Sequence, residues 1–387
     1  MKIAKDVNRL GTEAVYNIFA KTKKLEKQGK KIIDLSLGQS DFKSPKYVVD
    51  ATIQALKDGH HGYTLPNGII ECREAVSRKI KKLYSANINS ERIIIMPGGK
   101  PTMYYTIAFF GEPGAEIIYP DPGFPIYESM INYTGAKAVP FNLTEKKDLS
   151  INPDKILSLI NEKTRLLILN NPHNPTGSFT EKKVIDELAK GLTNFPHVTI
   201  LSDEIYDRLI FGKKEIPTLL NYPDLYERLI VLNGWSKTYA MTGWRLGWGV
   251  WPEQLIEHVF KFCVNNHSCV NTAAQYAAVA ALEGPEDHLN NMTKEFDIRR
   301  KLIVDGLRSL RGVECSLPGG SFFVFPNVKG TGMNGEQFTK KCLDEAGVAV
   351  IPGTAFGKFA TDHVRFNFAT SRENISKAIE KIDKILK

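Results

Sequence analysis

The chain of 387 residues has no apolar run that approaches the roughly 18 residues of a membrane span, so we expect no membrane partner. Cysteine is scarce and scattered, because the five cysteines are odd in number and form no C-x-x-C pair. This pattern excludes a disulfide framework and a cysteine-ligated zinc site, and it predicts reduced thiols, no bound metal and a cytoplasmic location. The N-terminal lysines, Lys2 and Lys5, are followed by no apolar core, so we expect no signal peptide.

One charge sign dominates only weakly, because 51 Lys and Arg face 43 Asp and Glu, a difference of +8. The basic residues are spread over the whole chain, and the densest runs, 21–31 and 78–82, alternate with apolar positions at helical spacing. Such runs are typical of solvated helix faces, and we expect no nucleic-acid partner. The hydrophobic content of 42% excludes a disordered chain.

Short apolar runs alternate with longer amphipathic stretches between residues 90 and 250. The runs are rich in Ile, Leu and Val, as strands buried on both faces are. They are Arg92–Met96, Glu116–Tyr119, Arg165–Asn170, Val198–Ser202 and Leu229–Leu232. Repeated strand–helix–strand order predicts an α/β fold with a mainly parallel sheet between helices. Ser178-x-x-Glu181 predicts a capping box at the start of the helix over 180–192.

The pattern changes toward the C-terminus. We expect two alternating strands at 321–325 and 364–368 and a short strand at 348–351. We also expect a helix over 335–346 and a second helix after Ser371. The helix-rich N-terminal stretch is expected to pack with them. The sequence therefore predicts a large domain of residues 46–285 and a smaller α+β domain of residues 286–387, completed by residues 1–45.

Polar clusters follow successive predicted strands at their carboxyl ends, where open parallel sheets bind ligands. Asn170–Gly177 follows one strand, Asp203–Tyr206 the next, and Ser236-Lys237 the third, with Arg245 eight residues after the lysine. Upstream, Pro97–Lys100 joins a strand to a helix start, where free N–H groups favour a phosphate. Each residue type alone is usually a cap or a surface charge. Their joint order predicts an amine, a carboxylate, a phenol, an amide and an arginine beside a phosphate-binding turn.

The strings NNPHNPTG, SDEIY and SKTYAMTGWRLGW resemble the class I aminotransferases, as do SLGQSDF near the start and VRFNFATS near the end. These are aspartate-aminotransferase-like enzymes of fold type I that use pyridoxal 5′-phosphate. The resemblance extends from about residue 10 to residue 387. It implies a homodimer with shared active sites. It also implies a ping-pong reaction that moves an amino group from an L-amino acid to a 2-oxo acid.

The resemblance implies a role for each matching residue around the cofactor. Lys237 would form the internal aldimine and later move the proton, and Asp203 would partner the pyridine nitrogen. Tyr206 and Asn174 would hydrogen-bond the ring hydroxyl oxygen. The phosphate would be held by Gly98, Gly99, Lys100, Ser236 and Arg245.

The resemblance also implies how substrate is held. Phe124 would stack on the cofactor beside the substrate, and Asn174 would contact both. Arg365 would grip the substrate α-carboxylate in a pocket that Gly38 lines. Tyr63 would reach the phosphate of the neighbouring subunit.

Elementary chemistry supports these roles. A carboxylate beside the pyridine nitrogen keeps it protonated, so that the ring can accept electrons. The lysine amine must be neutral to attack, and burial near cations such as Arg245 lowers its pKa. The planar fork of an arginine suits a substrate carboxylate better than the point charge of a lysine.

Specificity is expected to depend on Lys100 and Glu13. In prokaryotic aspartate enzymes of this type, a lysine matched by Lys100 contacts the distal carboxylate, together with a threonine that aligns with Glu13 here. Glu13 would repel a dicarboxylate or neutralise Lys100. We therefore expect broad donor use, with glutamate, alanine or aspartate as donors and 2-oxoglutarate as acceptor.

The sequence also bears on three other functions. A pyridoxal-phosphate-dependent β-lyase acting on cysteine conjugates would use the same lysine and aspartate. A cofactor-binding regulator is disfavoured because residues 1–45 are too short for a DNA-binding domain and linker. A nicotinamide dehydrogenase is disfavoured because Gly330-x-Gly332-x-x-Gly335 has no acidic residue about 20 positions later to hold a ribose.

Overall fold

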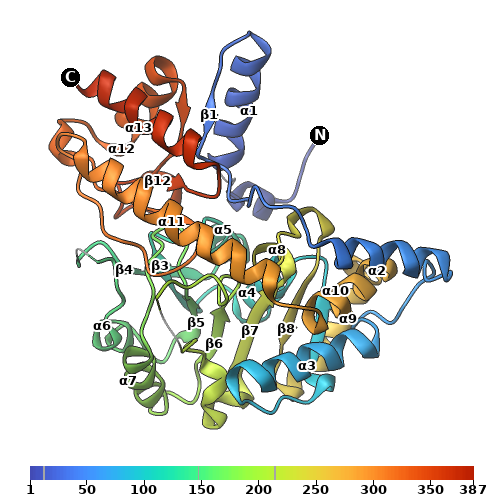
Figure 1. Ribbon diagram of the computed structural model, residues 1–387. Coiled ribbons are helices and arrows are strands. Elements are labelled where there is room, and N and C mark those ends of the chain that lie inside the picture. Colours follow the sequence, from blue (N-terminus) through green and yellow to red (C-terminus); the bar gives the residue numbers. More distant parts are fainter. Residues whose placement is uncertain (12–13, 147, 213–214) are drawn as a thin grey trace.

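A seven-stranded sheet lies at the centre of the computed structural model, which describes residues 1–11, 14–146, 148–212 and 215–387 (Figure 1). Its strand order is β2-β8-β7-β6-β5-β3-β4. All neighbouring strands are parallel except β8, which is antiparallel to β2 and β7. The strands are β2 (Ile93–Met96), β3 (Glu116–Asp121), β4 (Lys137–Asn142), β5 (Thr164–Asn170), β6 (Thr199–Asp203), β7 (Leu229–Gly234) and β8 (Gly247–Val250).

The α/β fold and the five strands expected from the apolar runs are confirmed, with small shifts at the strand ends. Two strands were missed. β4 contains Pro140 and begins at the exposed Lys137, so it carries no apolar run. In β8 the glycines Gly247 and Gly249 alternate with apolar residues and resemble a turn in sequence.

Both faces of the sheet are covered by helices, and successive strand residues enter different apolar clusters. In β2, Ile93 and Ile95 pack in one cluster, whereas Ile94 and Met96 pack in the other. This period of two explains why the central strands are continuous apolar runs. The helices are α2 (Lys46–Lys57), α3 (Ile70–Tyr84), α4 (Lys100–Phe110), α5 (Ile126–Thr134), α6 (Pro153–Ser158), α7 (Lys182–Leu192), α8 (Trp235–Thr238), α9 (Ile256–Asn266) and α10 (Thr272–Glu283).

The predicted capping box is wrong. The helix α7 begins at Lys182, and the residue before it, Glu181, accepts no capping hydrogen bond through its side chain. Ser178 Oγ instead lies 2.8 Å from Thr176 Oγ1, inside the preceding turn. The competing local hydrogen bond removes the serine from the helix start.

Segments from the N-terminal and C-terminal parts of the chain lie side by side (Figure 1). β1 (Ile33–Asp34) pairs in parallel with β10 (Val348–Ala349), and α1 (Ala14–Lys27) contacts β10 and β11 (Ile351–Pro352). β11, β12 (Val364–Asn367) and β9 (Phe323–Val324) form a three-stranded antiparallel sheet. The expected single strand over 348–351 is thus two strands in different sheets. The division of the chain at residues 45 and 285 stays a prediction.

Three more helices complete the C-terminal part. α11 (Asp287–Ser309) runs across the molecule, from the region of α10 toward the C-terminal elements (Figure 1). α12 (Gly335–Lys341) continues as a π-helix over Cys342–Ala346, and α13 (Arg372–Leu386) closes the chain. Ser371 caps α13 as expected, because its hydroxyl accepts from the Asn374 amide at 3.1 Å.

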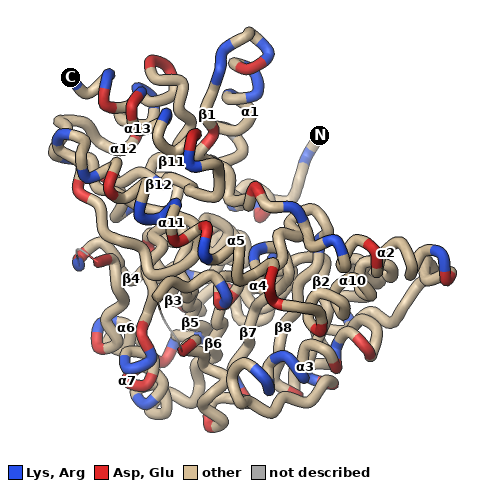
Figure 2. Tube along the Cα trace, in the orientation of Figure 1, with Lys and Arg blue, Asp and Glu red and all other residues tan. Residues whose placement is uncertain are grey.

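Acidic and basic residues are interspersed along the helices (Figure 2). Several pairs one helical turn apart form ion pairs, such as Lys46–Asp50 and Lys182–Asp186, each at 2.6 Å. This is the pattern of a solvated helix face. Among the described residues, no helix combines the length and apolar character needed to cross a membrane.

Candidate active site

A cavity of about 470 Å³ lies at the carboxyl ends of β5, β6 and β7, where the polar clusters were expected to meet. Its wall contains eleven residues that the sequence predicted: Gly38, Gly99, Lys100, Phe124, Asn174, Asp203, Tyr206, Ser236, Lys237, Arg245 and Arg365. Val15, Tyr16, Leu37, Met103 and Phe323 also line it. Gly98 is not part of the wall but lies directly against Arg245, which is. Of the predicted site residues, Tyr63 alone lies away from the cavity.

Lys237 lies on α8, directly after the buried strand β7. Glycine is required at position 234, because a Cβ atom would lie 2.8 Å from the Cα atom of Gly247 on the paired strand β8. The Lys237 Nζ atom donates to the Gly38 carbonyl at 2.6 Å. It also lies 5.8 Å from the ring centroid of Tyr206. The amine is therefore held inside the cavity between a backbone acceptor and an aromatic face.

Asp203 lies at the end of β6 and is almost fully buried. The Tyr127 hydroxyl donates to its Oδ2 atom at 2.7 Å, and the Ile205 amide donates to Oδ1 at 3.2 Å. Burial raises the pKa of Asp203 to about 6, whereas these hydrogen bonds and the charge of Lys237 lower it. The carboxylate is ionised above that pH and faces the cavity.

Tyr127 was missed by the sequence reasoning. It lies on α5, one turn after Phe124, and its side chain is completely buried. A tyrosine in an apolar helical pattern indicates core packing. Its hydroxyl therefore gives no sequence signal of a contact with Asp203, 76 positions away.

Arg365 comes from β12 and is 3% exposed. One guanidinium nitrogen donates to Asn174 Oδ1 at 3.0 Å, and the other donates to the Ser36 carbonyl at 2.6 Å. The guanidinium carbon lies 4.4 Å and 4.6 Å from the ring centroids of Phe323 and Phe356. Two hydrogen bonds and two aromatic faces thus fix the plane of the fork.

The opposite side of the cavity is suited to a phosphate. Gly98 has a φ of +89°, and a Cβ atom there would lie 2.1 Å from an Arg245 nitrogen, so this position requires glycine. Gly99 caps α4 without a side-chain hydrogen bond, so the first-turn N–H groups, other than at Pro101, which has none, point toward this end of the helix. Arg245 and the Ser236 hydroxyl line the same cavity. Amides, a hydroxyl and a guanidinium form a suitable donor set for a phosphate group.

The cavity as a whole fits a flat, phosphorylated pyridine. Phosphate donors lie at one side, the Asp203 carboxylate lies on β6, and the Phe124 ring provides an aromatic wall. Lys237 supplies an amine within the same cavity. The donor set therefore fits pyridoxal 5′-phosphate.

Lys100 begins α4, and its Nζ atom lies 5.4 Å above the Phe124 ring. The predicted partner Glu13 lies outside the described residues. Apolar side chains, those of Val15, Leu37 and Met103, line the cavity that Lys100 enters. The side chain of Lys100 is therefore surrounded in part by apolar residues of the cavity wall.

Tyr63 does not line the cavity and is 92% exposed. Several other large apolar side chains of this region are also exposed: Ile53, Leu56, Leu65 and Ile70. The contact of Tyr63 with a neighbouring subunit stays a prediction.

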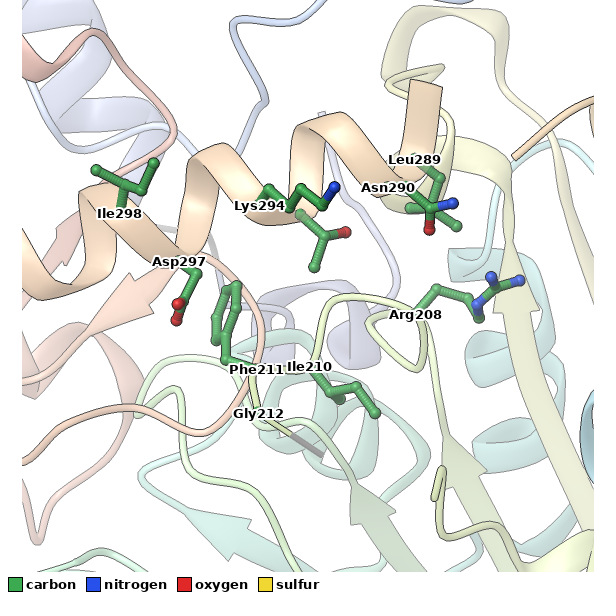
Figure 3. A pocket seen from close by; sticks show the side chains of 10 residues that line it. Arg208, Ile210, Phe211, Gly212, Leu289, Asn290, Lys294, Asp297 and Ile298 are labelled. Carbon is green, nitrogen blue, oxygen red and sulfur yellow. The ribbon is translucent and has the colours of Figure 1, made fainter. Parts of the chain in front are cut away.

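A second cavity, of about 700 Å³, lies between α11 and the loop 208–212 (Figure 3). None of the described residues that line it belongs to the predicted site. Arg208 is paired with Glu286 at 3.0 Å, and Asp297 is paired with Lys301 at 2.8 Å. Two charged residues of this cavity, Arg208 and Asp297, are thus engaged by neighbouring side chains, and we assign the cavity no chemistry.

Comparison with known proteins gives a consistent result over nearly the whole chain. Residues 30–382 match the family model "Aminotransferase class I and II". An aspartate aminotransferase from Pyrococcus horikoshii is 36% identical, over 99% of this chain and 97% of that protein. A (5-formylfuran-3-yl)methyl phosphate transaminase from Methanocaldococcus jannaschii is 35% identical, over 96% of both chains. The crystal structure of an aspartate aminotransferase from Rhizobium meliloti is similar with a TM-score of 0.95 and 29% identity, covering 100% of this chain and 99% of that one.

Proposed function

Because the chain belongs to the class I and II aminotransferases and is a transaminase, we propose that Lys237 carries pyridoxal 5′-phosphate in the cavity described above. The observation that carries the proposal is the meeting of Lys237, Asp203 and Arg365 in one cavity beside the Gly98–Lys100 turn. Enzymes of this family use that cofactor. When bound, it supplies a ring that takes up the electrons left when a substrate loses its α proton.

Each residue has a distinct task in this proposal. Asp203, ionised above about pH 6, would hold the ring nitrogen and favour its protonated form. Lys237 moves the proton of the substrate α carbon from within the cavity. Arg365, fixed by Asn174 and two aromatic rings, binds the substrate α-carboxylate with its planar fork. Tyr206 and Asn174 would hydrogen-bond the ring hydroxyl oxygen.

The substrates follow from this arrangement. Arg365 recognises the carboxylate that amino acids and 2-oxo acids share, so one site serves both halves of a ping-pong reaction. Lys100 supports an acidic side chain, as the names of the relatives from Pyrococcus and Rhizobium suggest. The apolar lining by Val15, Leu37 and Met103 supports neutral side chains. We therefore propose glutamate, alanine and aspartate as donors and 2-oxoglutarate as the main acceptor.

We also propose a cytoplasmic homodimer. The support for a dimer is the exposed apolar side chains around Tyr63, which a second subunit would cover. The scattered cysteines support a reducing compartment. Tyr63 would complete the phosphate site of the partner subunit.

Reductive trapping tests the proposal. Purified protein should be yellow, and borohydride should fix the cofactor to a peptide that contains Lys237. Lys237→Ala should abolish transamination and the adduct. Lys100→Met is the matched control, because it changes another lysine of the same cavity and should retain the adduct. An adduct on any lysine other than Lys237 contradicts the proposal.

A further inference from the structure

Residues 34–44, which we call the strap, cross the molecule between β1 and α2 and touch both ends of the substrate site. The Ser36 carbonyl accepts from Arg365 at 2.6 Å, and the Gly38 carbonyl accepts from Lys237 at 2.6 Å. Further along, the Ser44 hydroxyl donates to the Ala240 carbonyl at 3.0 Å. The position of the strap therefore affects where the amine and the guanidinium lie.

The strap is anchored beyond Gly38 by a buried arginine of α11. Arg299 is 7% exposed, and its Nη1 atom donates to Asp41 Oδ1 at 2.8 Å. Its guanidinium carbon lies 5.3 Å from the Phe42 ring centroid and 5.6 Å from that of Phe296. An arginine held by a strap carboxylate and by two rings has little freedom to move.

A second acid completes the anchor. Arg299 Nε donates to Glu295 Oε1 at 2.9 Å, one turn earlier on the same helix. Hydrogen bonds from Arg372 and Arg299 lower the pKa of Glu295 to about 2, so it stays ionised. Because Glu295 and the Phe296 ring, both on α11, hold Arg299 in place, the Asp41 contact transmits a fixed position to the strap.

We propose that the Asp41–Arg299 pair positions Gly38 against Lys237, and so sets the geometry of the reacting amine and of the α-carboxylate site. Gly38 has no side chain to anchor itself and lies close to the Phe323 ring. Its place in the chain is fixed on both sides. Before Gly38, the Ser36 carbonyl accepts a hydrogen bond from Arg365, and after it, the Asp41 carboxylate accepts one from Arg299. Asp41 and Arg299 do not line the cavity, so they are positioning residues.

The adjacent Arg300 provides a matched control. It lies on the same helix with similar burial, but its Nη1 atom donates to the Pro318 carbonyl at 2.7 Å and its guanidinium packs on Phe211. Loss of a buried cation from α11 is therefore common to Arg299→Gln and Arg300→Gln, whereas loss of the strap contact is specific to the first.

The experiment compares Asp41→Asn, Arg299→Lys, Arg299→Gln and the Asp41→Asn/Arg299→Gln double variant with Arg300→Gln. Deuterium exchange of the peptide covering residues 34–44 is measured in cofactor-free protein. In holoenzyme, kcat, KM and the pH titration of the cofactor absorption band are measured. The exchange arm reports the strap directly, and the absorption titration reports the environment of Lys237 without turnover.

We expect faster exchange of the strap and a rise in KM of about tenfold for every donor in Asp41→Asn and Arg299→Gln, since one partly buried charge contact is lost. The absorption titration should shift in both variants. Arg299→Lys should recover part of each effect because it keeps the charge. The double variant should be no worse than Arg299→Gln, because the two residues act through one contact. Arg300→Gln should change none of these readouts.

The inference is overturned if the strap loosens but KM and the titration stay at wild-type values, or if the two single effects multiply in the double variant. Equal effects from Arg300→Gln overturn it as well. The inference rests on the proposed role of Lys237, which trapping of the wild-type enzyme checks separately. A wild-type adduct on another lysine refutes the proposed function, while the exchange arm still reports whether Arg299 holds the strap.

Discussion

The hydrogen bond between Tyr127 and Asp203 offers a sharp test of how the site keeps a buried acid ionised. Tyr127→Phe removes the hydroxyl that donates to Asp203 Oδ2 at 2.7 Å and leaves the buried ring in place. A hydrogen bond to a charged group contributes about 1.5–3 kcal/mol. At about 1.36 kcal/mol per pKa unit, its loss should raise the pKa of Asp203 by about 1–2 units.

The sign of the effect follows from the direction of the shift. Burial already raises the pKa of Asp203 to about 6, and Tyr127 is the first of the contacts that oppose this rise. Without the hydroxyl, more of the carboxyl group is protonated near neutral pH. Because the proposed reaction needs the carboxylate, activity should fall at neutral pH and recover at alkaline pH.

The assay is the dependence of kcat/KM on pH for one amino donor. The acid limb of the Tyr127→Phe profile should move upward by about one pH unit or more, with near-normal activity on the alkaline side. Tyr105→Phe is the control, because Tyr105 is buried in the same apolar cluster but its hydroxyl accepts from Asn266 at 2.8 Å. A loss of equal size at every pH would refute the electrostatic reasoning, and so would an unchanged acid limb.

Four further predictions concern other side chains. Asp203→Ala should raise the activation free energy of α-proton abstraction by about 5 kcal/mol or more. Near-normal rates of this step in a rapid-mixing measurement would show that the role of Asp203 is only structural. Arg365→Lys keeps the charge but loses the fork, so kcat/KM should fall together for all substrates; a loss confined to dicarboxylates contradicts this. Glu13→Thr should free Lys100 and shift the aspartate-to-alanine ratio of kcat/KM toward aspartate by about 1–3 kcal/mol, whereas an unchanged ratio removes Glu13 from the specificity site. Burial raises the folded-state pKa of Glu204 to about 8, above its unfolded value, so its stabilising contribution is lost as pH rises through that value. The free energy of unfolding in urea should therefore fall by about 3 kcal/mol between about pH 6 and about pH 9, and this fall should be absent in Glu204→Gln.

The sequence was sufficient to predict five of the seven strands of the central sheet and the meeting of the polar clusters in one cavity, because both depend on patterns that are local in the chain. Central strands are buried on both faces and therefore read as apolar runs. The polar groups that follow them meet because the ends of parallel strands share one edge. Asp203, Lys237 and Asn174 could thus be assigned to one site although they are far apart in sequence.

Contacts made across the fold could not be predicted in this way. The bond from Tyr127 to Asp203 joins a helix to a strand, and the bond from Arg299 to Asp41 spans 258 positions. Ser178 matched the capping-box pattern, but its hydroxyl hydrogen-bonds the Thr176 hydroxyl instead of a helix amide. A sequence pattern does not compare such competing partners. An edge strand such as β4 is not predicted from the sequence, because it is partly exposed and therefore lacks a continuous apolar run.

Two adjacent buried acids at the end of β6, Asp203 and Glu204, have different roles: the first is placed for catalysis and the second affects stability. Asp203 lines the cavity, whereas the adjacent Glu204 accepts from the hydroxyls of Ser202 at 2.8 Å and Thr218 at 2.9 Å. Burial raises the pKa of Glu204 to about 8, so it is mostly neutral at the pH where Asp203 is ionised. Because Asp203 lines the cavity and Glu204 does not, only Asp203 can act on a ligand there. Between about pH 7 and about pH 9, above the pKa of Asp203, Asp203→Asn should therefore reduce activity with little effect on how stability depends on pH, and Glu204→Gln should do the reverse.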